Sequence, residues 1–230
     1  MRKILRWGIL ICFLGLAAGG SYVAIYFEQL LERYAPFDLR EPPDWLTDLQ
    51  LYYLRASPEK CFAVLARSEI AFTRQQYPLN ERGCGFDDGV LLTKQTISYG
   101  SNVLLRCPAA ASLVLWERHV LQQEAQRILK KNVRAIQTFG TFSCRNVNHK
   151  KQGRLSQHAT ANAIDIAGFT FTDGSRAVLL KDWDNGERGE FLRAVRDGAC
   201  RFFGGVLSPD YNAAHANHFH FDMGWWKICR

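Results

Sequence analysis

The N-terminal segment places the strongest constraint on how this chain folds. Arg2, Lys3 and Arg6 precede twenty residues, 7–26 (WGILICFLGLAAGGSYVAIY), that carry no charge. At helical rise such a run matches the ~30 Å hydrocarbon core of a bilayer. The basic flank is typical of the cytoplasmic side. We therefore expect a helix that spans a membrane once, with the rest of the chain exported. A cleaved signal peptide is the alternative interpretation.

The cysteines agree with export. Cys12 lies within the apolar segment, and the other six are spread through the rest of the chain. An even number of cysteines in an exported domain predicts three disulfides. Six cysteines allow fifteen pairings. We predict sequential ones: Cys61–Cys84, Cys107–Cys144 and Cys200–Cys229.

Length and charge indicate one globular domain and argue against nucleic acid as a partner. The chain has 230 residues, of which 47% are hydrophobic and 22% charged. Of the net charge of +7, three units precede residue 27, which leaves 7 − 3 = +4 for the rest. This weak, scattered charge does not predict nucleic-acid binding. We expect an anchor (1–26), a stalk (27–50) and a domain (51–230), and the oligomeric state stays open.

The hydrophobic patterns predict an α+β fold with a mainly antiparallel sheet and flanking helices. Ser57 and Pro58 are typical of a helix start, and helices are expected at 57–69, 107–132 and 186–200. Strands are expected at 133–144, 163–171, 176–183 and 217–223.

The sequence HANHFHFD near the C-terminus brings three of the six histidines close together. Alternate side chains of a strand share a face, so His218, His220 and Asp222 should point one way. Phe219 and Phe221 should point the other way, into the core. Two imidazoles on one face can share a metal, or one can bind it while the other works beside it.

A second segment, SQHATANAIDIAGF, offers a matching donor pair. Asp165 stands between Ile164 and Ile166, so its side chain should lie on the face opposite theirs. A buried carboxylate needs a partner, because burying a lone charge is expensive. That partner is either an arginine, such as Arg145, or a metal. In the second case His158, Asp165 and one histidine of the H-x-H pair make a mixed nitrogen and oxygen ligand set, typical of an open zinc site.

These two segments resemble the S-x-H-x-x-G-x-A-x-D and H-x-H signatures of LAS-type zinc peptidases, which include D-Ala-D-Ala peptidases and murein endopeptidases. The chain is more closely similar to the extensin-like C-terminal domain family of bacterial envelope proteins. That likeness covers about residues 44–230 and includes RGCGFDDGV, CPAAASLVLWERHVLQ, FSCRN and the terminal ICR. It implies a LAS-like fold for the domain.

The resemblance assigns a role to each position. It implies Zn²⁺ bound by His158, Asp165 and His220, with His218 and His215 as catalytic neighbours. In one departure, Ala161 replaces the glycine of the first signature, and this would strain a loop that needs positive φ.

Zinc chemistry would lower the pKa of water to ~7 and polarise a peptide carbonyl. Arg145 is assigned to a substrate carboxylate, with a structural ion pair to Asp222 or a contact to a carbonyl as the alternative. Tyr211, Trp225 and Trp226 are expected to pack in the core or tail rather than line a cleft.

The resemblance and the expected export together predict a zinc metallopeptidase that acts on peptidoglycan peptides. We expect it to span the inner membrane once, with its C-terminal domain in the periplasm. The alternative is a non-catalytic peptidoglycan-binding or structural envelope domain of the same fold.

Overall fold

The computed structural model describes residues 35–94 and 97–230, together with residues 15, 19, 20, 22, 23, 25–27, 29, 30, 32 and 33. Two units separate, residues 1–37 and 38–230. The described residues between 15 and 33 are helical. Within the described part of the chain, no helix has the length and apolarity needed to cross a membrane. Most of the expected anchor at 7–26 lies outside the described residues, so it stays a prediction.

The second unit begins at Asp38 and holds the folded domain. Its helices are α2 (Thr47–Ala56), α3 (Pro58–Arg67), α4 (Cys107–Trp116), α5 (Gln122–Glu124), α6 (Leu179–Asp182) and α7 (Gly186–Ala199). Its strands are β1 (Ala71–Tyr77), β2 (Phe86–Lys94), β3 (Val103–Arg106), β4 (Val133–Gly140), β5 (Ala163–Phe171), β6 (Arg176–Val178), β7 (Gly205–Leu207), β8 (Phe219–Asp222) and β9 (Ile228–Cys229). Residues 38–50, part of the stretch expected to be a stalk, therefore belong to the compact unit.

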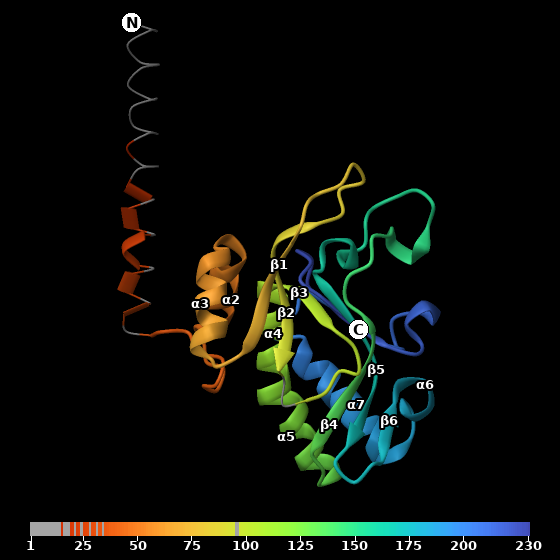
Figure 1. Cartoon of the computed structure of the whole chain (residues 1–230). Helices are drawn as coiled ribbons and strands as arrows, with labels where there is room; N and C mark the ends of the chain where they lie inside the picture. The colour runs from red at the N-terminus through yellow and green to blue at the C-terminus, as the bar shows by residue number, and fades with distance from the viewer. Residues whose placement is uncertain are drawn as a thin grey trace, which may run out of the picture. The chain divides into compact units, whose positions relative to one another are not determined.

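The described strands form two sheets. β1, β2 and β3 make an antiparallel three-stranded sheet, and the second sheet has the order β4-β5-β8-β7-β9 with β6 beside β5. Only the β7–β9 pair of the second sheet is parallel. The expected α+β class with mainly antiparallel strands is confirmed (Figure 1).

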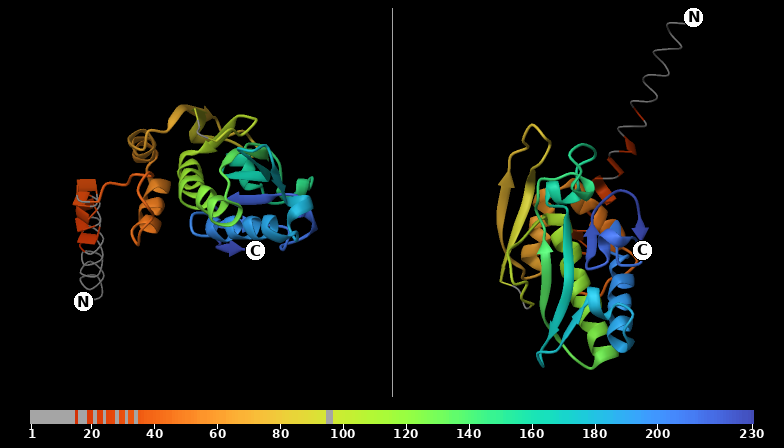
Figure 2. Two further views of the ribbon diagram at one scale, coloured as in Figure 1. Left: turned by 90° about the horizontal axis from the view of Figure 1, so that it is seen from below. Right: turned by 90° about the vertical axis from the view of Figure 1, so that its right-hand side faces the viewer.

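Helices α4 and α7 cover one face of the larger sheet (Figure 2). Trp116 of α4 packs against Phe169 and Phe221, with ring centroids 6.2 and 5.3 Å apart. Phe191 of α7 packs against Phe169 at 5.4 Å. All of these aromatic side chains are fully buried. The opposite face of β5 and β8 is therefore left to carry polar side chains.

A bulge in β5 allows this division. Gln137 pairs with Gly168 while Thr138 pairs with Ile166, so Ala167 is an extra residue. The extra residue shifts the alternation, which lets Ile166 and Phe169 both face the helices. Gly168 is required there, because a Cβ would lie 2.6 Å from the carbonyl oxygen of Ala177.

Two predicted features are wrong in detail. The strand expected at 176–183 ends at Val178, because Asp182 Oδ2 accepts the backbone N–H of Val178 at 2.8 Å and the chain turns into α6. The predicted sequential disulfides hold only for Cys200–Cys229. The others are Cys61–Cys107 and Cys84–Cys144.

The disulfide pattern follows from which segments pack together in the tertiary structure. Cys61 lies on α3, which packs against α4, where Cys107 begins the helix. Cys84 follows the turn after β1, and its bond to Cys144 links that turn to the loop that leads to His158.

Candidate metal centre

Strands β5 and β8 lie side by side and place Asp165 directly opposite His220. Their neighbours Ile164, Ile166, Phe219 and Phe221 are all fully buried. The expected alternation, with the phenylalanines and isoleucines inward and the polar side chains on the other face, is confirmed.

His158 comes from a 3-10 turn, η4 (Gln157–Thr160), that precedes β5. Ser156 begins the turn, and its Oγ accepts the backbone N–H of His158 at 3.3 Å. The turn ends at Ala161, which has a left-handed φ of +51°. The alanine that departs from the family signature therefore occupies a position that favours glycine.

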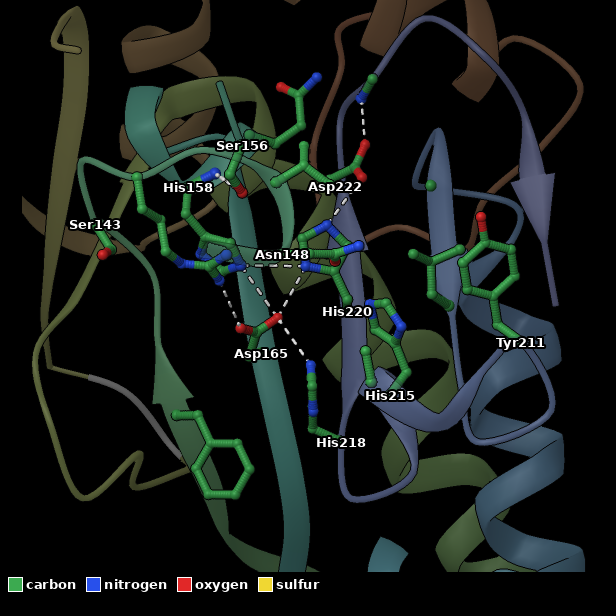
Figure 3. Close-up of a pocket in the computed structure, with 18 of the residues that line it drawn as sticks. Ser143, Asn148, Ser156, His158, Asp165, Tyr211, His215, His218, His220 and Asp222 are labelled. Atoms are coloured by element: carbon green, nitrogen blue, oxygen red, sulfur yellow. Dashed lines mark hydrogen bonds and ion pairs between the residues drawn. The ribbon is translucent and has the colours of Figure 1, made fainter. Parts of the chain in front are cut away.

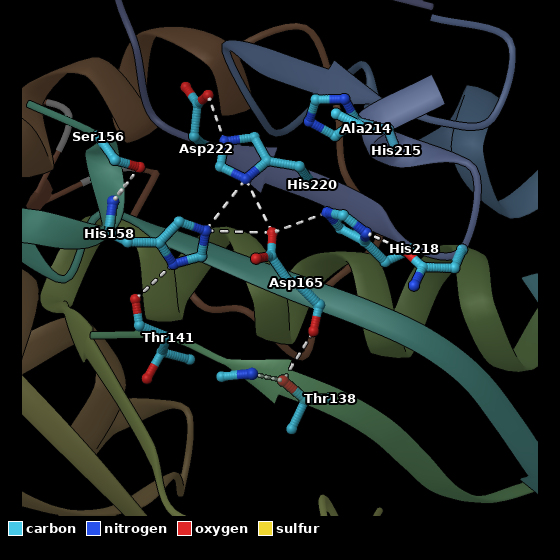
Figure 4. Close-up of polar contacts among 12 residues, drawn as sticks. Thr138, Thr141, Ser156, His158, Asp165, Ala214, His215, His218, His220 and Asp222 are labelled. Carbon is cyan, nitrogen blue, oxygen red and sulfur yellow. Dashed lines mark hydrogen bonds and ion pairs between the residues drawn. The ribbon is translucent and has the colours of Figure 1, made fainter. Parts of the chain in front are cut away.

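The three predicted ligands meet at one point (Figure 4). Nε2 of His158 lies 3.1 Å from Nδ1 of His220 and 3.1 Å from Oδ1 of Asp165. Nδ1 of His220 lies 2.8 Å from the same carboxylate oxygen. Among the described residues these three form the one group of histidine, cysteine and acidic side chains with ligand atoms this close together.

Hydrogen bonds on the far side of each ring fix the imidazole tautomers. Nδ1–H of His158 donates to the carbonyl oxygen of Thr141 at 2.7 Å, which leaves a lone pair on Nε2. Nε2–H of His220 donates to Oδ2 of Asp222 at 3.0 Å, which leaves the lone pair on Nδ1. Both lone pairs thus face the Asp165 carboxylate, an arrangement that calls for a cation or a proton between them.

The pKa values of His220 and Asp165 also indicate that a positive charge is favoured between these side chains. Burial acts to lower the pKa of His220, but its hydrogen bonds to Asp165 and Asp222 raise the pKa to about 9. Burial acts to raise the pKa of Asp165, but hydrogen bonds from His158 and His220 hold that pKa below its ordinary value. A positive charge is therefore stabilised at the point where the three side chains meet.

His218 and His215 line the open side of this cluster (Figure 3). Nε2 of His218 is 3.7 Å from Oδ1 of Asp165, and its Nδ1–H donates to Asn217 Oδ1 at 2.7 Å. The His215 ring lies 5.2 Å from that of His218, and its Nδ1–H donates to Asn212 Oδ1 at 2.8 Å.

Burial keeps these two histidines neutral. It lowers the pKa of His215 to about 4 and also lowers the pKa of His218. Each ring therefore has an unprotonated Nε2 at neutral pH, as a general base requires.

Arg145 also reaches the cluster. Its Nη2 lies 3.6 Å from Oδ2 of Asp165, the oxygen that the histidines do not use. Asp165 therefore contacts the arginine that the sequence suggested as a partner as well as the two histidines predicted to share a metal with it. Asp222, the alternative partner for Arg145, is occupied by His220 and by the backbone N–H of Gly224.

The cluster lies in a groove of about 940 Å³ lined by Phe139, Tyr211, Trp225 and Trp226 as well as the histidines. Trp225 is 83% exposed, Trp226 79% and Tyr211 43%. The expectation that these three pack in the core or tail is wrong, because the chain carries them on loops at the rim of the groove.

The supporting roles of two groups, the Thr141 carbonyl and the Asp222 carboxylate, were not predicted from the sequence. Nothing in the sequence marks the carbonyl oxygen of Thr141, because any residue supplies one. Asp222 has a signal, since it continues the alternation of His218 and His220. Its role in orienting His220 depends on χ angles that only the folded strand fixes.

Comparison with known families identifies the family of the chain. A family model, extensin-like protein C-terminus, matches residues 59–230. The chain belongs to the extensin-like C-terminal family. No match was found among curated proteins or among solved structures. The matched part of this extensin-like domain contains every residue of the cluster.

The donor set of the extensin-like domain suits zinc. Tetrahedral ligands at ~2.1 Å from the ion lie about 3.4 Å apart, close to the observed separations. Two neutral imidazole nitrogens and one carboxylate oxygen, each imidazole held by an outer hydrogen bond, are ligands that zinc accepts.

Proposed function

We propose that this extensin-like protein is a membrane-anchored, periplasm-facing zinc metallopeptidase that hydrolyses peptide bonds in peptidoglycan. The observation that carries the proposal is the convergence of two imidazole lone pairs and one carboxylate oxygen at a single point, at separations of 2.8–3.1 Å. Three protein ligands with an open side are typical of catalytic rather than structural zinc sites.

The choice of substrate rests on two other lines. The segments around His158 and His220 resemble the signatures of LAS-type zinc peptidases, a resemblance that would imply a LAS-like fold. The apolar segment 7–26 supports export to the periplasm, where peptidoglycan is the accessible peptide polymer.

Each residue of the cluster would have a distinct role in the hydrolysis of a peptide bond. His158, Asp165 and His220 would hold the ion, which supplies Lewis acidity for the peptide carbonyl and for water. His218 is placed to take a proton at Nε2 and to return it to the leaving amine. His215, whose Nε2 is also unprotonated, would share this proton transfer, and Arg145 would orient a substrate carboxylate.

A second candidate function is a non-catalytic envelope domain, and one observation favours it. With a proton on Nδ1, His220 is an imidazolium between Asp165 and Asp222, at 2.8 and 3.0 Å. Such a cluster satisfies its own charges without a metal. It would then serve only to join β8 to β5 and η4.

Metal content separates the two candidates. The full-length chain, purified in detergent and dialysed after exposure to zinc, should retain about one zinc per chain by mass spectrometry. His158→Ala and His220→Ala should lose it. His119→Ala is the matched control, because His119 lies outside the groove and contacts the carbonyl oxygen of Leu39 at 3.0 Å. A folded wild type that retains no zinc would refute the metal site.

Activity is then measured on purified cross-linked peptidoglycan fragments, with products identified by mass spectrometry. His218→Ala should keep its zinc and lose about 10²–10⁴-fold in rate, the range for a lost general base. Zinc binding without cleavage of any fragment would favour the non-catalytic domain.

A further inference from the structure

The loop after β8 presents two neighbouring tryptophans at the edge of the groove. Trp225 and Trp226 both line the groove that holds the metal cluster. Their exposed fractions, 83% and 79%, are unusual for indoles, which proteins mostly bury. Exposed aromatic side chains beside a cleft mark sites of interaction.

Both ends of this loop are fixed. At its start the backbone N–H of Gly224 donates to Oδ1 of Asp222 at 2.6 Å. At its end β9 pairs with β7, and Cys229 is bonded to Cys200. Because Asp222 also orients His220, the loop is built directly onto the cluster.

The two indoles differ in their surroundings. The guanidinium of Arg55 lies 5.9 Å from the centre of the Trp225 ring. Among the residues that the structure describes, no ring or cation is in contact with Trp226. Trp226 thus offers a flat, unoccupied ring face to a ligand in the groove.

Two side chains with hydrogen-bond donors line the same groove as the tryptophans. The side-chain oxygen of Gln157 accepts from Asn162 at 2.7 Å, while its Nε2 lies 3.4 Å from the position that a Cβ on Gly224 would take. Arg154 is exposed and lines the same groove. An amide N–H and a guanidinium that share one groove with an indole suit a ring that carries hydroxyl and acetamido groups.

We infer that Trp226, with Trp225 beside it, forms a saccharide subsite of this groove, so that the chain recognises peptides still attached to a glycan strand. The apolar C–H face of a pyranose ring would stack on the indole. Its polar groups would meet Gln157 and Arg154. A membrane surface fits less well, because the tryptophans edge a concave groove that also holds Gln157, Arg154 and the histidine cluster.

The inference rests on the proposed function for its substrate class, but its test does not depend on zinc or cleavage. Glycan strands from which all peptides have been removed are titrated into the EDTA-treated full-length chain in detergent. Tryptophan fluorescence and calorimetry should both report binding. Trp226→Ala should weaken the strands' affinity at least tenfold, and Trp226→Phe should keep it within about threefold. Trp45→Ala is the control, because Trp45 is 85% exposed and outside the groove.

Three results would overturn the inference. The first is no binding of glycan strands to a folded wild type, and the second is unchanged binding by Trp226→Ala. The third comes from vesicles with brominated lipids. Trp7 of the expected anchor should be quenched in every variant, so lipid quenching that is clearly larger in wild type than in Trp226→Ala would assign Trp226 to the membrane.

The zinc-loaded enzyme offers a separate readout. Trp226→Ala should lower kcat/KM for glycan-linked fragments and leave free peptides unaffected. An inactive wild type would count against the peptidase proposal, while glycan binding would still decide the subsite.

Discussion

Asp222 accepts a hydrogen bond from Nε2 of His220 at 3.0 Å and thereby turns Nδ1 of that imidazole toward Asp165. This pair makes the geometry of the cluster depend on a residue that is not one of the three proposed ligands. The same carboxylate holds Gly224, the first residue of the tryptophan loop, through Oδ1.

Asp222→Ala should therefore weaken zinc binding without removing a ligand. Loss of an outer hydrogen bond to a ligating histidine typically costs 10–100-fold in metal affinity. We expect this range for Asp222→Ala and a smaller loss for Asp222→Asn, which keeps an acceptor oxygen. Competition with a chromogenic chelator measures both. Equal affinity of Asp222→Ala and wild type would contradict a positioning role.

Zinc affinity should rise with pH up to about 9. In the metal-free protein His220 holds a proton with a pKa of about 9, whereas Asp165 is already ionised because its pKa is lowered. Zinc must displace that proton, so affinity should increase about tenfold per pH unit between 7 and 9 and then level off. Calorimetry in buffers of different ionisation enthalpy should show about one proton released at pH 7.5. A flat profile across this range would contradict the coupling.

The metal-free protein should become less stable as pH rises, over a range that overlaps the one for zinc affinity. The pKa of His220 is raised in the folded state, so its protonation stabilises the fold fully below the ordinary pKa of 6.5. That stabilisation disappears as pH rises through about 9. Urea unfolding of the EDTA-treated chain should show the loss between pH 6.5 and 9, and His220→Gln should not. An equal loss in His220→Gln would assign the effect to another group.

Glu117 predicts a pH effect away from the groove. It lies in a π-helical turn that continues α4, and burial raises its pKa to about 8. Its Oε1 has no hydrogen-bond partner among the described residues. Because the folded pKa exceeds the unfolded one, stability contributed by the protonated carboxyl is complete below about 4.5 and lost as pH rises to about 8.

Glu117→Gln should therefore be more stable than wild type at pH 8 and similar to it at pH 4.5. The difference should grow by about 1.4 kcal/mol per pH unit within this window. Glu81→Gln, at an exposed turn position, should change stability by less than about 0.5 kcal/mol at either pH. Thermal unfolding at the two pH values measures both variants, and a pH-independent difference would argue against ionisation of Glu117.

Ala161→Gly should be neutral or slightly stabilising, although Ala161 is fully buried. A left-handed backbone costs a residue with a Cβ about 1–2 kcal/mol, and this strain is relieved in glycine. Glycine also loses more conformational entropy on folding, which offsets about 0.4–1 kcal/mol of the stability gained. Ala159→Gly in the same turn is the matched control, because Ala159 lacks positive φ and should lose stability. Thermal unfolding of the two variants and of the wild type measures the effect of each substitution on stability. A loss for Ala161→Gly as large as that for Ala159→Gly would show that no strain is relieved.

The sequence by itself determined the local rules of the cluster. Strand alternation is a property of any extended chain, so the common face of His218, His220 and Asp222 followed from their spacing. The inward isoleucines likewise placed Asp165 on the opposite face. The sequence also indicated that Ala161 would be strained if its loop needed positive φ, and the structure shows a positive φ there.

Only the tertiary structure decided which distant parts meet. The pairing of Cys61 with Cys107 depends on α3 packing against α4, and that of Cys84 with Cys144 on a turn meeting a loop. The carbonyl of Thr141, the orientation of His220 by Asp222 and the exposure of Trp226 arise in the same way. The physical reason is that strand periodicity is set by neighbouring residues, whereas these contacts are set by how sheets, helices and loops close on one another.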